Sequence, residues 1–156
     1  MATTAAPYGA RPIGTLSSSG SFTGMTRHMP IITTYDTLIS NGDFVSVHTD
    51  GTIIKNTGTT ALGAVGIFMG CSYTDPTTGQ KTFSNFWPAD NAATDAMAYV
   101  LDDPFVLIQM QADEAMNTTD RGLNAAVVVT AGSATFGKSK NALDGSTPAT
   151  TATLPL

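Results

Sequence analysis

The chain has 156 residues, of which 42% are hydrophobic and 12% are charged, and its formal net charge is −5. This length suits one domain, and the hydrophobic fraction is sufficient for one core, which argues against wholesale disorder. Seven basic residues scattered along an acidic chain do not supply the clustered cations that sequence-independent nucleic-acid binding requires, and no run of about 18 apolar residues indicates a membrane span.

Threonine and serine replace the missing charge, with 26 Thr and 11 Ser in the chain. Threonine is β-branched and fits a solvated pleat, so this composition predicts an all-β protein. Sparse surface charge favours a protein built into a larger assembly, and a slightly acidic soluble protein is an equal alternative. Cys71 is the single cysteine, which excludes an intrachain disulfide, and its apolar neighbours predict a buried, unreactive thiol.

The first 28 residues differ in composition from the rest of the chain. They are rich in Gly, Pro, Ser and Thr and lack periodicity, which predicts a flexible or docking N-terminal arm. Arg11, Pro12, Ile13 and Phe22 would be unusual in a purely solvated tail, so we expect these four residues to bind a neighbouring subunit. A frayed terminus is the alternative.

Residues 29–156 are predicted to form a single β-rich domain, a compact antiparallel sandwich or barrel, because turn signals recur about every ten residues. Asp50-Gly51 predicts a tight hairpin, and the glycines of the longest apolar run favour a bulged strand over a helix. A short helix is expected near residues 114–116. The predicted strands cover residues 31–35, 44–48, 53–55, 61–73, 81–87, 97–101, 105–111, 125–129 and 150–156.

Few residues suggest chemistry, and they are His28, His48 and the acidic pairs Asp102–Asp103 and Asp113–Glu114. A catalytic histidine needs a partner within hydrogen-bond reach, and a metal usually needs three or four converging ligands. Neighbouring side chains of an extended segment point to opposite faces, so the acidic pairs are expected to sit at turns. We therefore predict no enzyme, catalytic residue, metal site or cofactor.

Several short motifs follow one another in the middle of the chain. They are G-x-F-x-G-C-x-Y at Gly66–Tyr73, a return F-S-N-x-W-P at Phe83–Pro88, and Y-V-x-D-D-P at Tyr99–Pro104 leading to Q-A-D at Gln111–Asp113. In this order the motifs resemble those of small virion structural proteins of tailed bacteriophages. The resemblance covers residues 62–113 well and 118–156 loosely. The segment Leu143–Thr147 is similar too, whereas the N-terminal arm carries none of the pattern.

The resemblance implies a head decoration (cement) or minor capsid protein on the virion surface, made in the host cytoplasm. Such a protein binds the major capsid protein and is commonly a homotrimer, without nucleic acid or membrane as a partner. The alternative is a receptor- or carbohydrate-binding module of a phage fibre or tail, using Tyr73, Phe83, Phe86 and Trp87 as a platform. A core position is more typical of such clustered aromatics, and a phage hydrolase would need converging acids.

Overall fold

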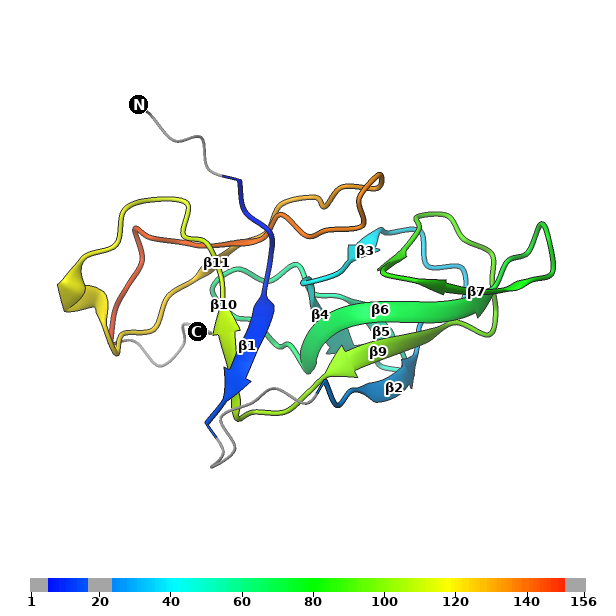
Figure 1. Ribbon diagram of the computed structural model, residues 1–156, viewed down its shortest axis with the longest axis horizontal. Coiled ribbons are helices and arrows are strands. Elements are labelled where there is room, and N and C mark those ends of the chain that lie inside the picture. The colour runs from blue at the N-terminus through cyan, green and yellow to red at the C-terminus, as the bar shows by residue number, and fades with distance from the viewer. Residues whose placement is uncertain (1–5, 17–23, 151–156) are drawn as a thin grey trace.

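A computed structural model of the protein describes residues 6–16 and 24–150 (Figure 1). Within these ranges the regular structure consists of strands and one short 3₁₀ helix, so the predicted all-β class is confirmed. The elements are β1 (Arg11–Thr15), β2 (Arg27–Pro30), β3 (Ile39–Ser40), β4 (Phe44–Val47), β5 (Ile53–Lys55), β6 (Gly66–Thr74), β7 (Lys81–Ser84), β8 (Phe86–Trp87), β9 (Met97–Leu101), β10 (Val106–Gln109), η1 (Thr118–Asp120), β11 (Val127–Val128) and β12 (Ala142–Leu143).

Six strands form an antiparallel sheet around β6, the longest of them. One edge of β6 pairs with β9, whereas the other edge pairs with β4 near its start and with β7 near its end. The sheet then continues from β9 to β2 and from β4 to β5. Most residues of β6 are buried, as expected for a strand covered on both faces.

Gly70 allows β6 to bend at the predicted bulge. The register between β6 and β9 shifts between Phe68 and Gly70. The φ angle of Gly70 is +148°, and a Cβ atom there would come within 2.9 Å of the carbonyl oxygen of Ser84. Both observations require glycine at this position.

The main core is built around Trp87, whose side chain is fully buried. The indole Nε1–H donates a 3.0 Å hydrogen bond to the backbone oxygen of Tyr35, and the ring meets Tyr73 edge-on with 5.4 Å between centroids. Cys71 lies in the same cluster, so the predicted burial of its thiol is confirmed. Burial raises the pKa of this thiol to about 12.

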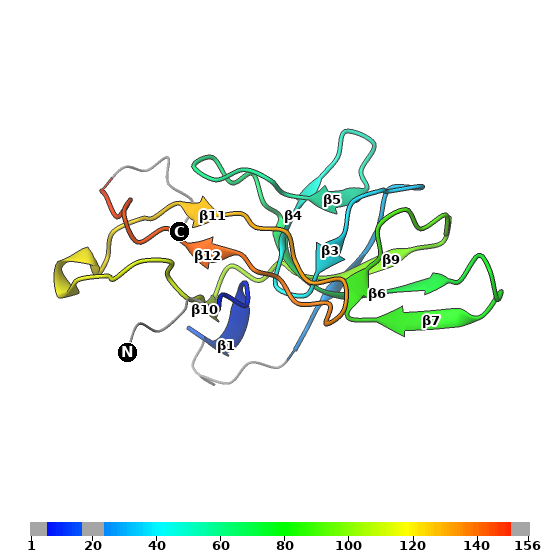
Figure 2. The same cartoon turned by 90° about the horizontal axis from the view of Figure 1, so that it is seen from above.

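The remaining strands form short antiparallel pairs, among them β1–β10 and β11–β12. These two pairs lie at the end of the molecule opposite the β6–β7 hairpin (Figure 2). A bridge between Ala112 and Leu143 connects the chain after β10 to β12. A second core joins these strands to the central sheet and contains Ala10, Phe44, Ile67, Leu101 and Val127.

The central sheet curls without closing into a full barrel. Ile31, which directly follows β2, makes one parallel bridge to Ile53 of β5. The N–H of Ile32 also donates to the oxygen of Ile53 at 3.4 Å. The two edges therefore approach each other at one point, and the fold is a curled antiparallel sheet with smaller strand pairs beside it.

The described part of the predicted N-terminal arm contributes strands to the sheets of its own chain. β1 pairs with β10, so that Arg11 lies opposite Gln109 and Pro12 lies opposite Ile108. β2 pairs with β9 over four residues. The predicted boundary after residue 28 falls inside β2, and paired structure begins well before it, because the partner strands come from a distant part of the chain.

Strands that are adjacent in the sequence form hairpins, as predicted. β4 and β5 form the hairpin expected around Asp50-Gly51, but only Gly51 has a positive φ angle, so the loop is a three-residue turn. β6 and β7 form the second hairpin. The predicted return strand is interrupted at Asn85, because β8 leaves β6 and pairs with β3.

Several other strand predictions differ from the structure. The strand predicted at 31–35 is wrong, because beyond the bridge at Ile31 the chain turns, with Thr34 at φ +57°. The short helix expected near 114–116 is replaced by η1 a few residues later. β12 lies outside all the predicted strands. The predicted final strand falls outside the described residues except for residue 150.

Candidate interaction surface

The pair formed by β1 and β10 exposes an unusual amount of apolar surface. We call β1, β10 and the adjoining Leu16 and Phe105 the apolar ribbon. Among the described residues, ten large hydrophobic side chains are exposed, and five of them belong to the ribbon, namely Ile13 (57% exposed), Leu16 (69%), Phe105 (62%), Leu107 and Ile108. Exposed apolar side chains gathered on one strand pair make it a candidate interaction site.

The sequence of β10 explains the exposure. Val106 and Met110 pack against the second core, so one face of β10 points inward. A strand that is solvated on its outer face normally carries polar side chains there, but Phe105 and Leu107 occupy the outer face. β10 is therefore apolar on both faces, although only one of them is covered by the chain.

A groove runs along the inner side of the apolar ribbon. It has a volume of about 380 Å³ and is floored by Met110 and Leu143. Ile13 and Ile108 of the ribbon line it together with Met116, another exposed apolar side chain. An apolar side chain of a partner protein would fit such a groove.

The structure places three of the four predicted partner-binding residues on β1. Pro12 and Ile13 belong to the apolar ribbon, and Ile13 lies where the register between β1 and β10 shifts. Arg11 is exposed and lines a different pocket, together with Lys138. Phe22 lies outside the described residues. Sequence reasoning missed Leu107, although the unbroken apolar run of residues 105–108 was a signal for a strand without a polar face.

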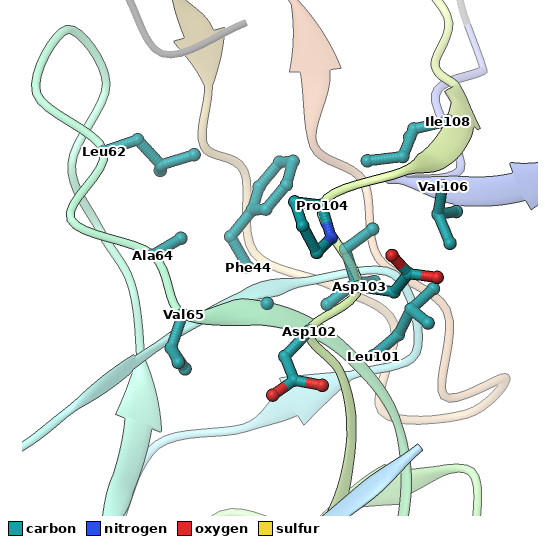
Figure 3. Close-up of a pocket in the computed structure, with 12 residues that line it drawn as sticks. Phe44, Leu62, Ala64, Val65, Leu101, Asp102, Asp103, Pro104, Val106 and Ile108 are labelled. Atoms are coloured by element: carbon teal, nitrogen blue, oxygen red, sulfur yellow. The ribbon is translucent and has the colours of Figure 1, made fainter. Parts of the chain in front are cut away.

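A second pocket lies where β9 leads into β10 (Figure 3). Its walls are mainly apolar, with Phe44 and Leu62 facing the turn that carries Asp102 and Asp103. The two carboxylates point apart, as predicted for neighbours on an extended segment. Asp102 pairs with Arg27 at 2.8 Å between Oδ2 and Nε, and Asp103 accepts the N–H of the turn residue 105 at 2.9 Å.

The histidines have local contacts of a structural kind. The ring of His28 lies 4.7 Å from the ring of Tyr99. The Nδ1 atom of His48 lies 3.0 Å from a carboxylate oxygen of Asp50, which forms an ion pair when the imidazole is protonated. Among residues 6–16 and 24–150, no three His, Cys, Asp or Glu side chains are grouped so that they could hold a metal ion.

The aromatic side chains of β6, β7 and β8 are divided between the core and the surface. Trp87 and Tyr73 are buried in the main core, as predicted for a core face, whereas Phe83 is 73% exposed on β7. Phe86 is half-buried. A sugar platform built on Trp87 is therefore not available on the surface.

Comparisons with protein-family models, with curated proteins and with solved structures found no match to this chain. The resemblance to phage virion proteins and the role that it implies therefore stay predictions. In the part of the chain that the structure describes, no helix reaches the length and apolarity needed to cross a membrane.

Proposed function

We propose that this protein is a non-enzymatic head decoration (cement) protein of a tailed bacteriophage. In this proposal it binds the outer face of the capsid, contacts the major capsid protein and stabilises the assembled shell. The observation that carries the proposal is the apolar ribbon, a strand pair whose large apolar side chains the chain itself leaves exposed. The motif resemblance at residues 66–113 supplies the identity of the partner, and the sparse charge is consistent with assembly.

The amount of apolar surface on one ribbon indicates that a single copy of the protein would bind the shell weakly. Burying each of five partly exposed side chains contributes roughly 1 kcal/mol, or about 5 kcal/mol in all. Association costs on the order of 4–15 kcal/mol in lost freedom of motion, so one ribbon alone would bind weakly. A homotrimer at a three-fold position of the shell would present three ribbons, and the linked contacts would then give high avidity.

The fibre-module alternative loses its main support in this structure. An exposed Trp87 beside Tyr73 and Phe86 would favour it, but the side chains of Trp87 and Tyr73 are buried. Of the exposed aromatic side chains, Phe105 belongs to the apolar ribbon, Phe83 lies on β7, and Phe136 lies in a loop, where its backbone oxygen accepts a hydrogen bond from the Asn85 side chain. No observation on the described residues favours this alternative over assembly.

Binding to shells that lack the protein tests the proposal. Expanded capsids assembled without the decoration protein are mixed with purified protein and sedimented, and the bound fraction is measured. The wild type should sediment with the shells and raise the temperature at which they fall apart. Leu107→Asp should abolish binding, because it places a charge in the ribbon.

Phe83→Asp provides the matched control. It makes the same change in charge at an exposed apolar strand position outside the ribbon, so it should bind like the wild type. Failure of the wild type to bind shells, or equal binding by the Leu107 and Phe83 variants, would contradict the proposal. Circular dichroism of both variants separates loss of binding from loss of folding.

A further inference from the structure

The unpaired positive charges of this acidic protein gather in one place. Of its seven cationic side chains, those of Arg27, Lys55 and Lys81 form salt bridges with aspartates. Of the four others, three lie in two adjoining pockets that share Tyr8 and Lys138: Arg11, Lys138 and Lys140. Only Arg121 lies elsewhere, next to η1.

Arg11 and Lys138 line a groove of about 580 Å³ that is separate from the apolar ribbon's own groove. We call it the basic groove, and its lining residues are Tyr8, Ala10, Arg11, Pro12, Asn41, Met69 and Lys138. Both charged side chains are exposed, whereas the remainder of the lining is uncharged. The groove therefore combines two cationic side chains with a wall of apolar side chains and the amide group of Asn41.

Backbone hydrogen bonds bring the two segments that carry the cations to Asn41 and Gly42. The N–H of Ala10 donates to the oxygen of Gly42 at 2.9 Å, which positions the segment that carries Arg11. The N–H of Asn41 donates to the oxygen of residue 137 at 2.9 Å, and Asn41 bridges Lys138. The backbones of Arg11 and Lys138 are thus held near each other before any ligand binds.

Gly9 permits this close approach of three segments. Its φ angle is +78°, and a Cβ atom there would come within 2.4 Å of the Cβ atom of Ser139 and 2.7 Å of the oxygen of Gly42. The chain therefore brings residues 8–11 against residues 137–141 at a point that only glycine allows. Such preorganisation lowers the cost of binding a ligand.

We propose that the basic groove binds a carboxylate-rich segment of a partner protein. The chain supplies no acid of its own to Arg11 or Lys138 among the described residues. Asp43 contacts Ser139, the neighbour of Lys138, but it is fully buried and paired with Lys55. Two unpaired cations beside an apolar wall complement a short peptide that carries Asp or Glu next to apolar residues.

The charge of the whole molecule favours a short acidic peptide over a nucleic acid. Three cations neutralise few phosphates, and the net charge of −5 repels a long polyanion wherever it extends beyond the groove. A peptide segment keeps its carboxylates within about one Debye length, roughly 8–10 Å, of the two cations. It therefore gains the local attraction with little of the long-range repulsion.

This inference is independent of the proposed capsid role, because any partner with an acidic segment would fit. The test uses isolated protein and a fluorescein-labelled hexaglutamate peptide, followed by fluorescence anisotropy at low salt. The wild type should bind the peptide, and should not bind a hexaglutamine peptide. The amide NMR signals of Tyr8, Asn41 and Lys138 should shift on binding. Raising the salt concentration should weaken binding, because the contacts are exposed.

The double variant Arg11→Gln/Lys138→Gln should bind hexaglutamate roughly tenfold more weakly, which corresponds to the loss of two exposed ion pairs. The matched control Lys81→Gln/Arg121→Gln makes the same change in net charge outside the groove and should change the affinity less than about twofold. Arg11→Lys/Lys138→Arg should retain binding. If the double variant fails to fold, this conservative pair and the NMR map decide the question.

Three results would overturn the inference: no binding of hexaglutamate by the wild type, equal loss in the groove and control variants, or tighter binding of a six-nucleotide oligothymidylate than of hexaglutamate. These results do not depend on the capsid assay. Peptide binding by a protein that ignores phage shells would reject the capsid role alone, and shell binding without peptide binding would reject the groove alone.

Discussion

The buried ion pair between Asp43 and Lys55 yields the sharpest stability prediction. Asp43 is fully buried, and its Oδ2 atom lies 2.9 Å from the Lys55 Nζ atom, whose side chain is 6% exposed. The same carboxylate accepts the N–H of Ser40 at 2.9 Å and the hydroxyl of Ser139 at 2.5 Å. This network connects β5, the β3–β4 turn and the segment that carries the basic groove.

Asp43→Asn leaves the ammonium group of Lys55 buried without a counter-charge, and such a change costs about 3–5 kcal/mol of unfolding free energy. A domain of this size has about 5–15 kcal/mol in total, so the variant should lose a large fraction of its stability. Lys55→Met should be destabilising as well. The double variant should be more stable than the sum of the single effects implies, with a coupling of roughly 2 kcal/mol or more.

Urea unfolding followed by circular dichroism measures these free energies. The exposed pair between Lys81 and Asp95 is the control, because its atoms lie at the same 2.9 Å distance while both side chains are 46% exposed. Replacing Lys81 with Met should cost at most about 1 kcal/mol. If Asp43→Asn costs no more than Lys81→Met, or if the double-mutant cycle shows no coupling, the argument from burial is refuted.

Three further predictions concern the core and a turn. Trp87→Phe should lower the unfolding free energy measured in urea by roughly 2–4 kcal/mol, because it opens a cavity and leaves the backbone oxygen of Tyr35 without its donor. A loss below about 1 kcal/mol would contradict the central role of Trp87 in the core. Cys71 should react with a thiol reagent at pH 8 only after unfolding, since burial raises its pKa to about 12, and rapid reaction of the native protein would refute this. The hydroxyl and N–H of Thr52 hold the Asp50 pKa at about 2, below its unfolded value. Asp50→Ala should therefore be less stable than the wild type at pH 6, and the difference should shrink steadily as the pH falls from about 4 to about 2. An unchanged difference at pH 2 would contradict that assignment.

Elements marked by a local sequence signal could be predicted from the sequence. β9 matches the predicted strand at 97–101, because a short apolar run ends at Asp102-Asp103-Pro104. The β4–β5 hairpin forms around Gly51, because a turn signal joins two adjacent apolar segments. β1 and β2 could not be predicted in this way. Their hydrogen-bonding partners, β10 and β9, lie far along the chain, and nothing in the polar N-terminal composition indicates them.

The candidate surface could be predicted in part. Ile13 is an apolar residue in a polar segment, which indicates an interaction, and it lies on the apolar ribbon. The exposure of Leu107 could not be predicted, since a continuous apolar run does not show which face of the strand the rest of the chain leaves uncovered. The basic groove could not be predicted from the sequence. Arg11 and Lys138 are far apart along the chain, and only backbone contacts at Asn41 and Gly42 bring their segments together.

Imaging of the phage particle at side-chain resolution decides whether this chain is a capsid decoration protein. Copies of the chain should lie on the outer capsid surface around three-fold positions, with Ile13 and Leu107 of the apolar ribbon buried against neighbouring chains. Absence of the chain from the particle, or a ribbon that faces solvent in every bound copy, would contradict the proposed role.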